Sequence, residues 1–124
     1  MRLSHARSLT LEERALFVSY FSERILTHAR IIEGRVPFWL NKKMCAVVLG
    51  RNIYFRSGIY QPKHIASIEL LAHELTHVEQ YLSGMTILKY LWASRRGYLK
   101  NHYEIAAYAK SAAIRSALQR INFC

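Results

Sequence analysis

Residues 70–80 read Leu-Leu-Ala-His-Glu-Leu-Thr-His-Val-Glu-Gln, and the rest of the chain can be interpreted outward from this stretch. Its apolar residues recur at helical spacing, and its two histidines are four positions apart. Residues four apart on a helix lie one turn above each other, so the ring nitrogens of His73 and His77 can converge on one ion. The stretch therefore predicts a helix, from about residue 63 to 83, that presents two metal ligands.

The residue after the first histidine suggests what a metal would do there. Zinc binds imidazole nitrogens at about 2.0 to 2.1 Å, and Glu74 is turned roughly 100° away from His73 on the helix. Its carboxylate can then take a proton from a zinc-activated water instead of filling a coordination position. Gln80 and Glu69 share the metal face, so we expect Gln80 to orient a ligand or the substrate. Glu79 points away and is expected to be a surface carboxylate.

The same motif can also arise by chance as polar residues on a solvated helix face. Here its neighbours are apolar, so the histidines are expected at a buried seam, where an unpaired imidazole would cost free energy. These neighbours are Ile65, Ile68, Leu70, Leu71, Ala72, Leu75, Val78 and Leu82.

Composition is that of one globular domain spanning residues 1–124, with 52% hydrophobic and 21% charged residues. Lys and Arg number 18 against 8 Asp and Glu, which gives a net charge of +10. Such a field favours an acidic partner or an anionic surface. The basic residues are spread along the chain without a continuous block, so nucleic acid is not the expected partner.

Every acidic residue is a glutamate, so a carboxylate ligand must be one of eight side chains. Cys45 and Cys124 lack a metal-binding spacing, and we expect two free thiols, with one disulfide as the alternative. The N-terminus does not have the pattern of a secretory signal, and no run of 18 apolar residues would form a transmembrane segment. We therefore expect a cytoplasmic protein, with export by another route left open.

The remaining elements follow from local patterns. Thr10 and Glu13 form a capping-box pattern, and the apolar spacing after it predicts a helix over residues 11–33. Short β-type runs over residues 45–56, separated by Gly50-Arg51, predict a hairpin. A last, alanine-rich helix is predicted over residues 101–122.

That last helix carries Glu104, and on its adjoining face the small residues Ala107 and Ser111. Small side chains let two helices approach closely, so that a carboxylate on one can reach an ion held by the other. Among the eight glutamates, Glu104 is therefore the best third ligand.

His73-Glu74-x-x-His77 followed by Glu104-x-x-Ala107 resembles the gluzincin class of zinc metallopeptidases. The chain is most similar to small bacterial metallopeptidase-like domains of unassigned function, through residues 50–55, 71–80 and 101–108. The resemblance covers about residues 45 to 110. It implies a minimal zincin-like fold of the α+β class, mostly α, in which the motif helix packs against the later glutamate-bearing helix.

The resemblance also implies the roles of individual residues. His73, His77 and Glu104 would bind Zn²⁺, and Glu74 would be the general base. Tyr108 is the first candidate to stabilise the oxyanion, followed by Tyr103 and His102.

We expect a zinc-dependent hydrolase, specifically a metallopeptidase acting on a peptide or protein substrate. The strand at residues 53–56 would offer its edge to an extended peptide. One alternative is a catalytically silent zinc-binding interaction module, accessory to a larger secretion or toxin system. A further alternative is a basic nucleic-acid-binding helical domain with a chance motif.

Overall fold

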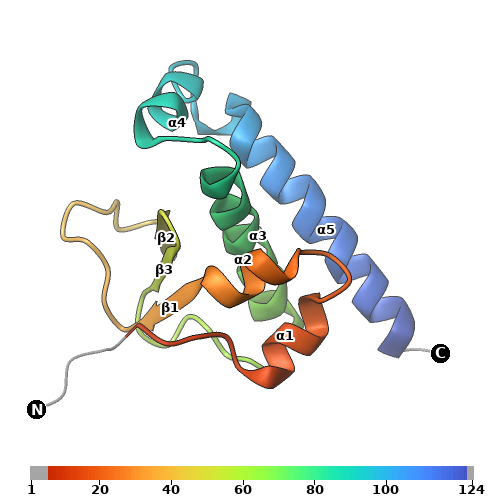
Figure 1. Cartoon of the computed structure of the whole chain (residues 1–124). Coiled ribbons are helices and arrows are strands. Elements are labelled where there is room, and N and C mark those ends of the chain that lie inside the picture. Colours follow the sequence, from red (N-terminus) through yellow and green to blue (C-terminus); the bar gives the residue numbers. More distant parts are fainter. Residues whose placement is uncertain (1–5, 123–124) are drawn as a thin grey trace, which may run out of the picture.

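A computed structural model describes residues 6–122, with side chains through Arg120. The fold is α+β and mostly helical, with one small sheet (Figure 1), as predicted. None of the helices in this range is long and apolar enough to cross a membrane. In chain order the elements are α1 (Leu11–Phe17), α2 (Glu23–His28), β1 (Arg30–Glu33), β2 (Ala46–Leu49), β3 (Asn52–Phe55), α3 (Ile65–Leu82), α4 (Ile87–Ala93), the 3-10 turn η1 (Tyr98–Lys100) and α5 (His102–Asn122).

The prediction of a single helix over residues 11–33 is wrong. The capping box at Thr10 does start α1, but this helix ends at Phe17. A second cap at Ser22, whose hydroxyl accepts from the Ile25 backbone N–H, starts α2. The next residues form strand β1, because the β-branched Ile31 and Ile32 pair with β3. The apolar residues keep helical spacing past the end of α1 at Phe17 and the end of α2 at His28, so the sequence pattern did not indicate either end.

The sheet has the strand order β1-β3-β2. β2 and β3 form the predicted antiparallel hairpin, which turns at Gly50 with φ of +64°. β1 lies parallel to β3 on its other side. β3 is therefore the central strand, and the expectation that it offers a free edge is wrong. Of the two hairpin strands, β2 is the one that lies at an edge of the sheet.

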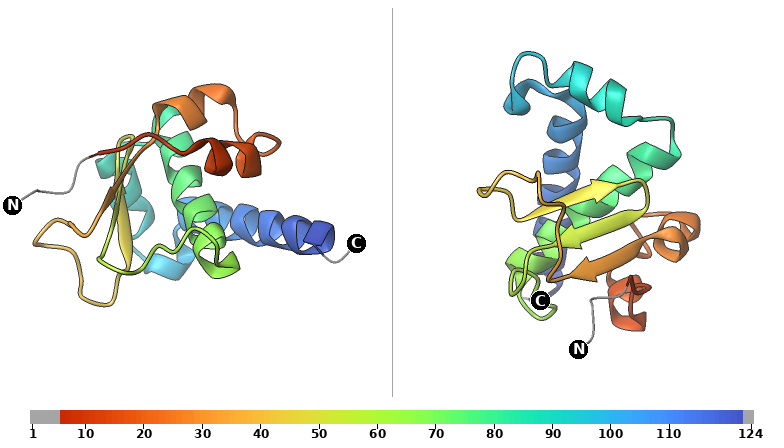
Figure 2. Two further views of the ribbon diagram at one scale, coloured as in Figure 1. Left: turned by 90° about the horizontal axis from the view of Figure 1, so that it is seen from below. Right: turned by 90° about the vertical axis from the view of Figure 1, so that its left-hand side faces the viewer.

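Helix α3 is the middle layer of the molecule, between the sheet and α5 (Figures 1 and 2). Leu71, Leu75 and Val78 of α3 are fully buried in the core. Ala107 and Ser111 of α5 are also buried, as their small size predicted. The close approach of these two helices places the candidate ligands together.

Cys45, next to β2, is exposed and is a free cysteine. Cys124 lies outside the described residues, so its state stays a prediction.

Candidate metal centre

Three ligand atoms from two helices converge in the interior. Nε2 of His73 lies 2.9 Å from Oε1 of Glu104, and Nε2 of His77 lies 3.1 Å from the same oxygen. The two Nε2 atoms are 3.2 Å apart. All three residues are buried. The structure thus brings together the three residues predicted as ligands.

This triangle of atoms fits a small divalent cation. In a tetrahedral site with bonds near 2.1 Å, ligand atoms are separated by about 3.4 Å, close to the observed spacing. Two imidazole nitrogens and one carboxylate oxygen are also a donor set that such cations accept. The His73, His77 and Glu104 cluster can therefore hold a metal ion.

The electrostatics of the cluster favour positive charge at its centre. Burial lowers the pKa of His77, but the hydrogen bond and the negative charge of Glu104 raise it by more. Burial raises the pKa of Glu104, and its hydrogen bonds with His73 and His77 shift it well below the ordinary range. An ionised carboxylate beside two imidazoles attracts either a proton or a metal cation.

Gln80 controls the orientation of His77. Its amide nitrogen donates to the backbone oxygen of Tyr103 at 2.9 Å, so its amide oxygen is the atom 2.8 Å from Nδ1 of His77. A carbonyl oxygen only accepts, so Nδ1 carries the proton and the Nε2 lone pair of neutral His77 faces the cluster. The structure therefore places Gln80 where the helical wheel predicted, behind a ligand.

Tyr90 holds the other oxygen of Glu104, and sequence reasoning missed it. Its hydroxyl donates to Oε2 of Glu104 at 2.5 Å, so Oε1 is the oxygen that faces the histidines. Burial is the main reason that the pKa of Tyr90 is raised, and the carboxylate adds to the shift. Tyr90 belongs to α4, an apolar segment whose spacing to Glu104 follows no metal-site motif.

Glu74 faces an open space beside the ligands. Burial raises its pKa to about 6, although the charges of His73 and His77 oppose the shift. Within residues 6–122 its carboxylate makes no hydrogen bond to another protein group. It lines a cavity of about 400 Å³ together with the three ligands. The other walls are mostly apolar and come from β2, α4 and the preceding loops, including Trp39, Met44, Met85, Ile87 and Leu91.

Tyr108 does not face the same cavity. Its ring packs on that of His73, with 4.4 Å between centroids, and its hydroxyl lies 3.2 Å from that of Tyr98. Tyr98, which sequence analysis did not single out, lines the metal cavity. His102 is exposed, and Tyr103 contributes its backbone oxygen to Gln80. Tyr90 and Tyr98 thus line the metal cavity, whereas the predicted candidates Tyr108 and Tyr103 do not.

The neighbouring glutamates of α3 have other partners. Glu79 forms an ion pair with Lys110 at 3.1 Å, and the amine of Lys110 lies 4.0 Å from the ring centroid of Phe21. Glu69 forms an ion pair with Arg115 at 2.7 Å. Neither carboxylate joins the metal cluster, which leaves Glu104 as the acidic ligand.

Comparisons with known proteins place the chain in a family without naming an enzymatic activity. A family model described as the eCIS core domain, for extracellular contractile injection system, matches residues 8–85. This match includes the sheet and the motif helix α3, and it ends before α4 and Glu104. Neither the curated proteins nor the solved structures provide a match. Because the matched residues make up more than half of its length, the chain belongs to the eCIS core domain family.

Proposed function

We propose that this chain is a zinc-binding domain that works with other proteins of an extracellular contractile injection system. The observation that carries the proposal is the buried convergence of His73, His77 and Glu104 in a chain of this family. It corresponds to the interaction module that the sequence left as an alternative.

In this role the metal would join two parts of the domain. His73 and His77 lie on α3, inside the matched residues, and Glu104 lies on α5, outside them. A cation bound to all three links the helices, so its binding free energy also stabilises the folded state. We propose that the metal holds α5 in the position needed for contact with other components.

Elemental analysis of the purified chain tests this proposal. We expect about one zinc ion per chain in the parent and its loss in His77→Ala. The matched control is His28→Ala, because His28 is an exposed histidine on α2. If the parent contains no zinc and takes none up from a zinc-containing buffer, the proposal is wrong.

A second candidate function is peptide hydrolysis, favoured by the position of Glu74. Zinc bound here would activate a water molecule for attack on a peptide carbonyl. Glu74 could accept the proton and return it to the leaving amine, because its carboxylate lines the same cavity as the three ligands and is not one of them. The edge strand β2 lines the same cavity and could pair with an extended peptide.

Glu74→Gln separates the two functions. The variant should bind zinc as the parent does, because Glu74 is not one of the three converging ligands. If the domain is a peptidase, this variant should lose cleavage by roughly 100-fold or more. If the zinc-loaded parent cleaves no member of a broad peptide library, the hydrolase candidate fails and the binding module stands.

A further inference from the structure

Helix α4 and turn η1 form a tip at one end of the molecule, away from the C-terminal end of α5 (Figure 1). Large apolar side chains on this tip are at least half exposed. Clusters of this kind in a folded chain usually mark an interaction surface. The exposed side chains are those of Ile87, Leu88, Leu91, Trp92 and Leu99.

The tip is firmly attached to the body, so these exposed side chains are held in place. Asn101 is fully buried, and its amide donates to the backbone oxygen of Tyr90 at 3.2 Å and to the hydroxyl of Ser94 at 2.7 Å. Tyr90 in turn donates to Glu104 in the metal cluster. These hydrogen bonds fix the position of α4 in the folded chain, and its exposed apolar side chains are held on the surface with it.

The tip is also strongly basic. It carries Lys89, Arg95, Arg96 and Lys100, and no acidic residue occurs between Glu79 and Glu104. None of the four cations forms an ion pair in the described part of the chain. The guanidinium of Arg95 lies 4.3 Å from the ring centroid of Trp92. Exposed Trp and Leu beside Arg and Lys are typical of segments that lie at the surface of an anionic membrane.

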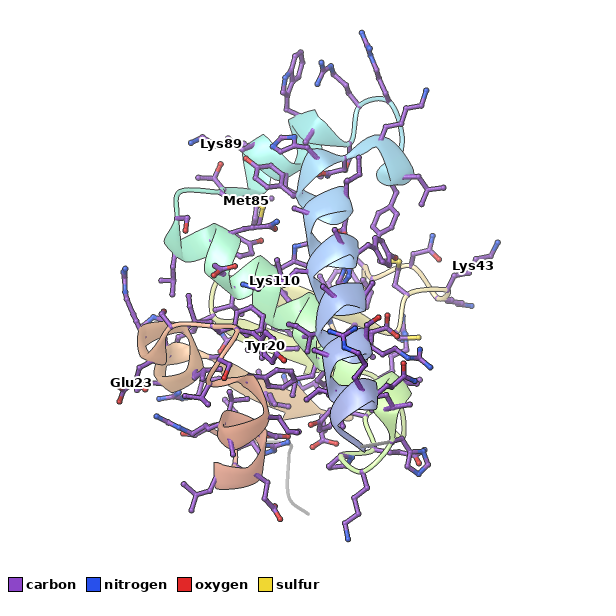
Figure 3. The ribbon with its side chains drawn as sticks, turned by 90° about the vertical axis from the view of Figure 1, so that its right-hand side faces the viewer. Tyr20, Glu23, Lys43, Met85, Lys89 and Lys110 are labelled. Atoms are coloured by element: carbon purple, nitrogen blue, oxygen red, sulfur yellow. The ribbon has the colours of Figure 1, made fainter. Side chains whose placement is uncertain are left out.

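We infer that this tip docks on an anionic lipid bilayer. Leu88 and Trp92 would enter the headgroup region, and Arg95 and Arg96 would bind lipid phosphates. Charge complementarity favours this partner, because the four cations alternate along the chain with the apolar residues and no acidic residue lies among them. Figure 3 shows the exposed position of Lys89 on α4 at this end of the molecule; its amine also donates to the backbone oxygen of Gly84.

Docking in this way would bring the metal cavity close to the membrane. Ile87 and Leu91 of the tip line that cavity, and so does Trp39 from the loop between β1 and β2. This loop also carries Lys42 and Lys43, and Lys43 extends away from the body (Figure 3). A protein segment lying at the bilayer surface would then have direct access to the cavity.

Vesicle binding tests the inference with a reporter within the tip. The chain has two tryptophans, so Trp39→Phe leaves Trp92 as the only one. Vesicles of phosphatidylcholine with one third phosphatidylglycerol should shift the Trp92 emission to the blue, and vesicles of phosphatidylcholine alone should not. High salt should reverse the shift, because the attraction to anionic lipid is screened.

Matched variants separate the tip from the net charge of the chain. Arg96→Glu should weaken binding to the anionic vesicles by roughly tenfold or more. Arg24→Glu, at an exposed position on α2, changes the net charge equally and should alter binding by less than about threefold. Leu88→Ser should also weaken binding, whereas Leu11→Ser at an exposed site on α1 should not.

Three results would overturn the inference. One is the absence of binding to anionic vesicles, and another is an equal loss in Arg24→Glu and Arg96→Glu. The third is a concentration-dependent dimer that sedimentation detects and Leu88→Ser abolishes, in a chain that does not bind vesicles. That result would mean that the tip binds a second copy of the chain.

Discussion

Tyr90 donates its hydroxyl to Oε2 of Glu104 and leaves Oε1 to face the two histidines. The carboxylate of Glu104, on α5, therefore connects Tyr90 of α4 with the two histidines of α3. Groups that hydrogen-bond to a metal ligand usually affect the affinity for the metal as well as the orientation of the ligand. The effect of removing this hydroxyl can be predicted.

Tyr90→Phe should weaken zinc binding by about 10- to 100-fold, since Glu104 loses the bond that fixes its orientation. Competition with a chromophoric chelator measures the affinity. Tyr103→Phe is the matched control, because Tyr103 contributes to the site through its backbone oxygen. Equal affinity of Tyr90→Phe and the parent would show that the bond does not support the site.

Gln80 should affect the metal through His77 in a way that depends on hydrogen bonding. Gln80→Leu removes the acceptor for Nδ1 of His77 and should lower zinc affinity by about 10- to 100-fold. Gln80→Glu keeps an acceptor and should retain most of the affinity, although it loses the bond to Tyr103. The same chelator competition distinguishes a hydrogen-bonding role of Gln80 from a packing role. If Gln80 acted only through packing, the zinc affinity of Gln80→Glu would not exceed that of Gln80→Leu.

These contacts show how far the sequence predicts the site. The spacing within one helix was sufficient for His73, His77 and Gln80, because helical geometry alone places them on one face. Glu104 needed in addition the small residues Ala107 and Ser111 to indicate helix contact. Tyr90 could not be found in this way, since the turn after α4 and the buried Asn101 bring it to Glu104 only in the folded chain.

The fold was predictable to a similar extent. The hairpin and the mostly helical α+β class follow from local patterns. The N-terminal strand β1 does not, because Ile31 and Ile32 fit a helical stripe as well as a strand until the pairing with β3 is formed. This pairing also decides which strand is the edge, so the wrong helix and the wrong edge have one cause.

The capping box of α1 predicts a pH-dependent stability. Burial raises the pKa of Glu13, but the hydrogen bonds from Arg7, Tyr60 and the Thr10 backbone lower it by more. The pKa of Glu13 in the folded chain therefore lies below its ordinary value of 4.5. A lowered pKa contributes stability that is complete above pH 4.5 and is lost as the pH falls through the lower, folded value.

Glu13→Gln should therefore lower the free energy of unfolding at pH 7 by about 1 to 3 kcal/mol. The difference from the parent should shrink on acidification below pH 4.5. Denaturant unfolding at several pH values measures it. Glu12→Gln, an exposed neighbour on the same helix, should show a small difference throughout. A difference for Glu13→Gln that grows on acidification would contradict the assigned direction of the pKa shift.

The contact between α3 and α5 should couple stability to metal binding. Ala107 is fully buried there, so Ala107→Leu must push the helices apart and should cost about 1 to 3 kcal/mol of unfolding free energy. Glu104 lies one turn before Ala107, so the same displacement should move its carboxylate from the histidines and weaken zinc binding. Ala106→Leu, at the exposed neighbouring position, should change neither property. If Ala107→Leu lowers stability but binds zinc as tightly as the parent, the ligands would have to be held independently of how closely the helices pack.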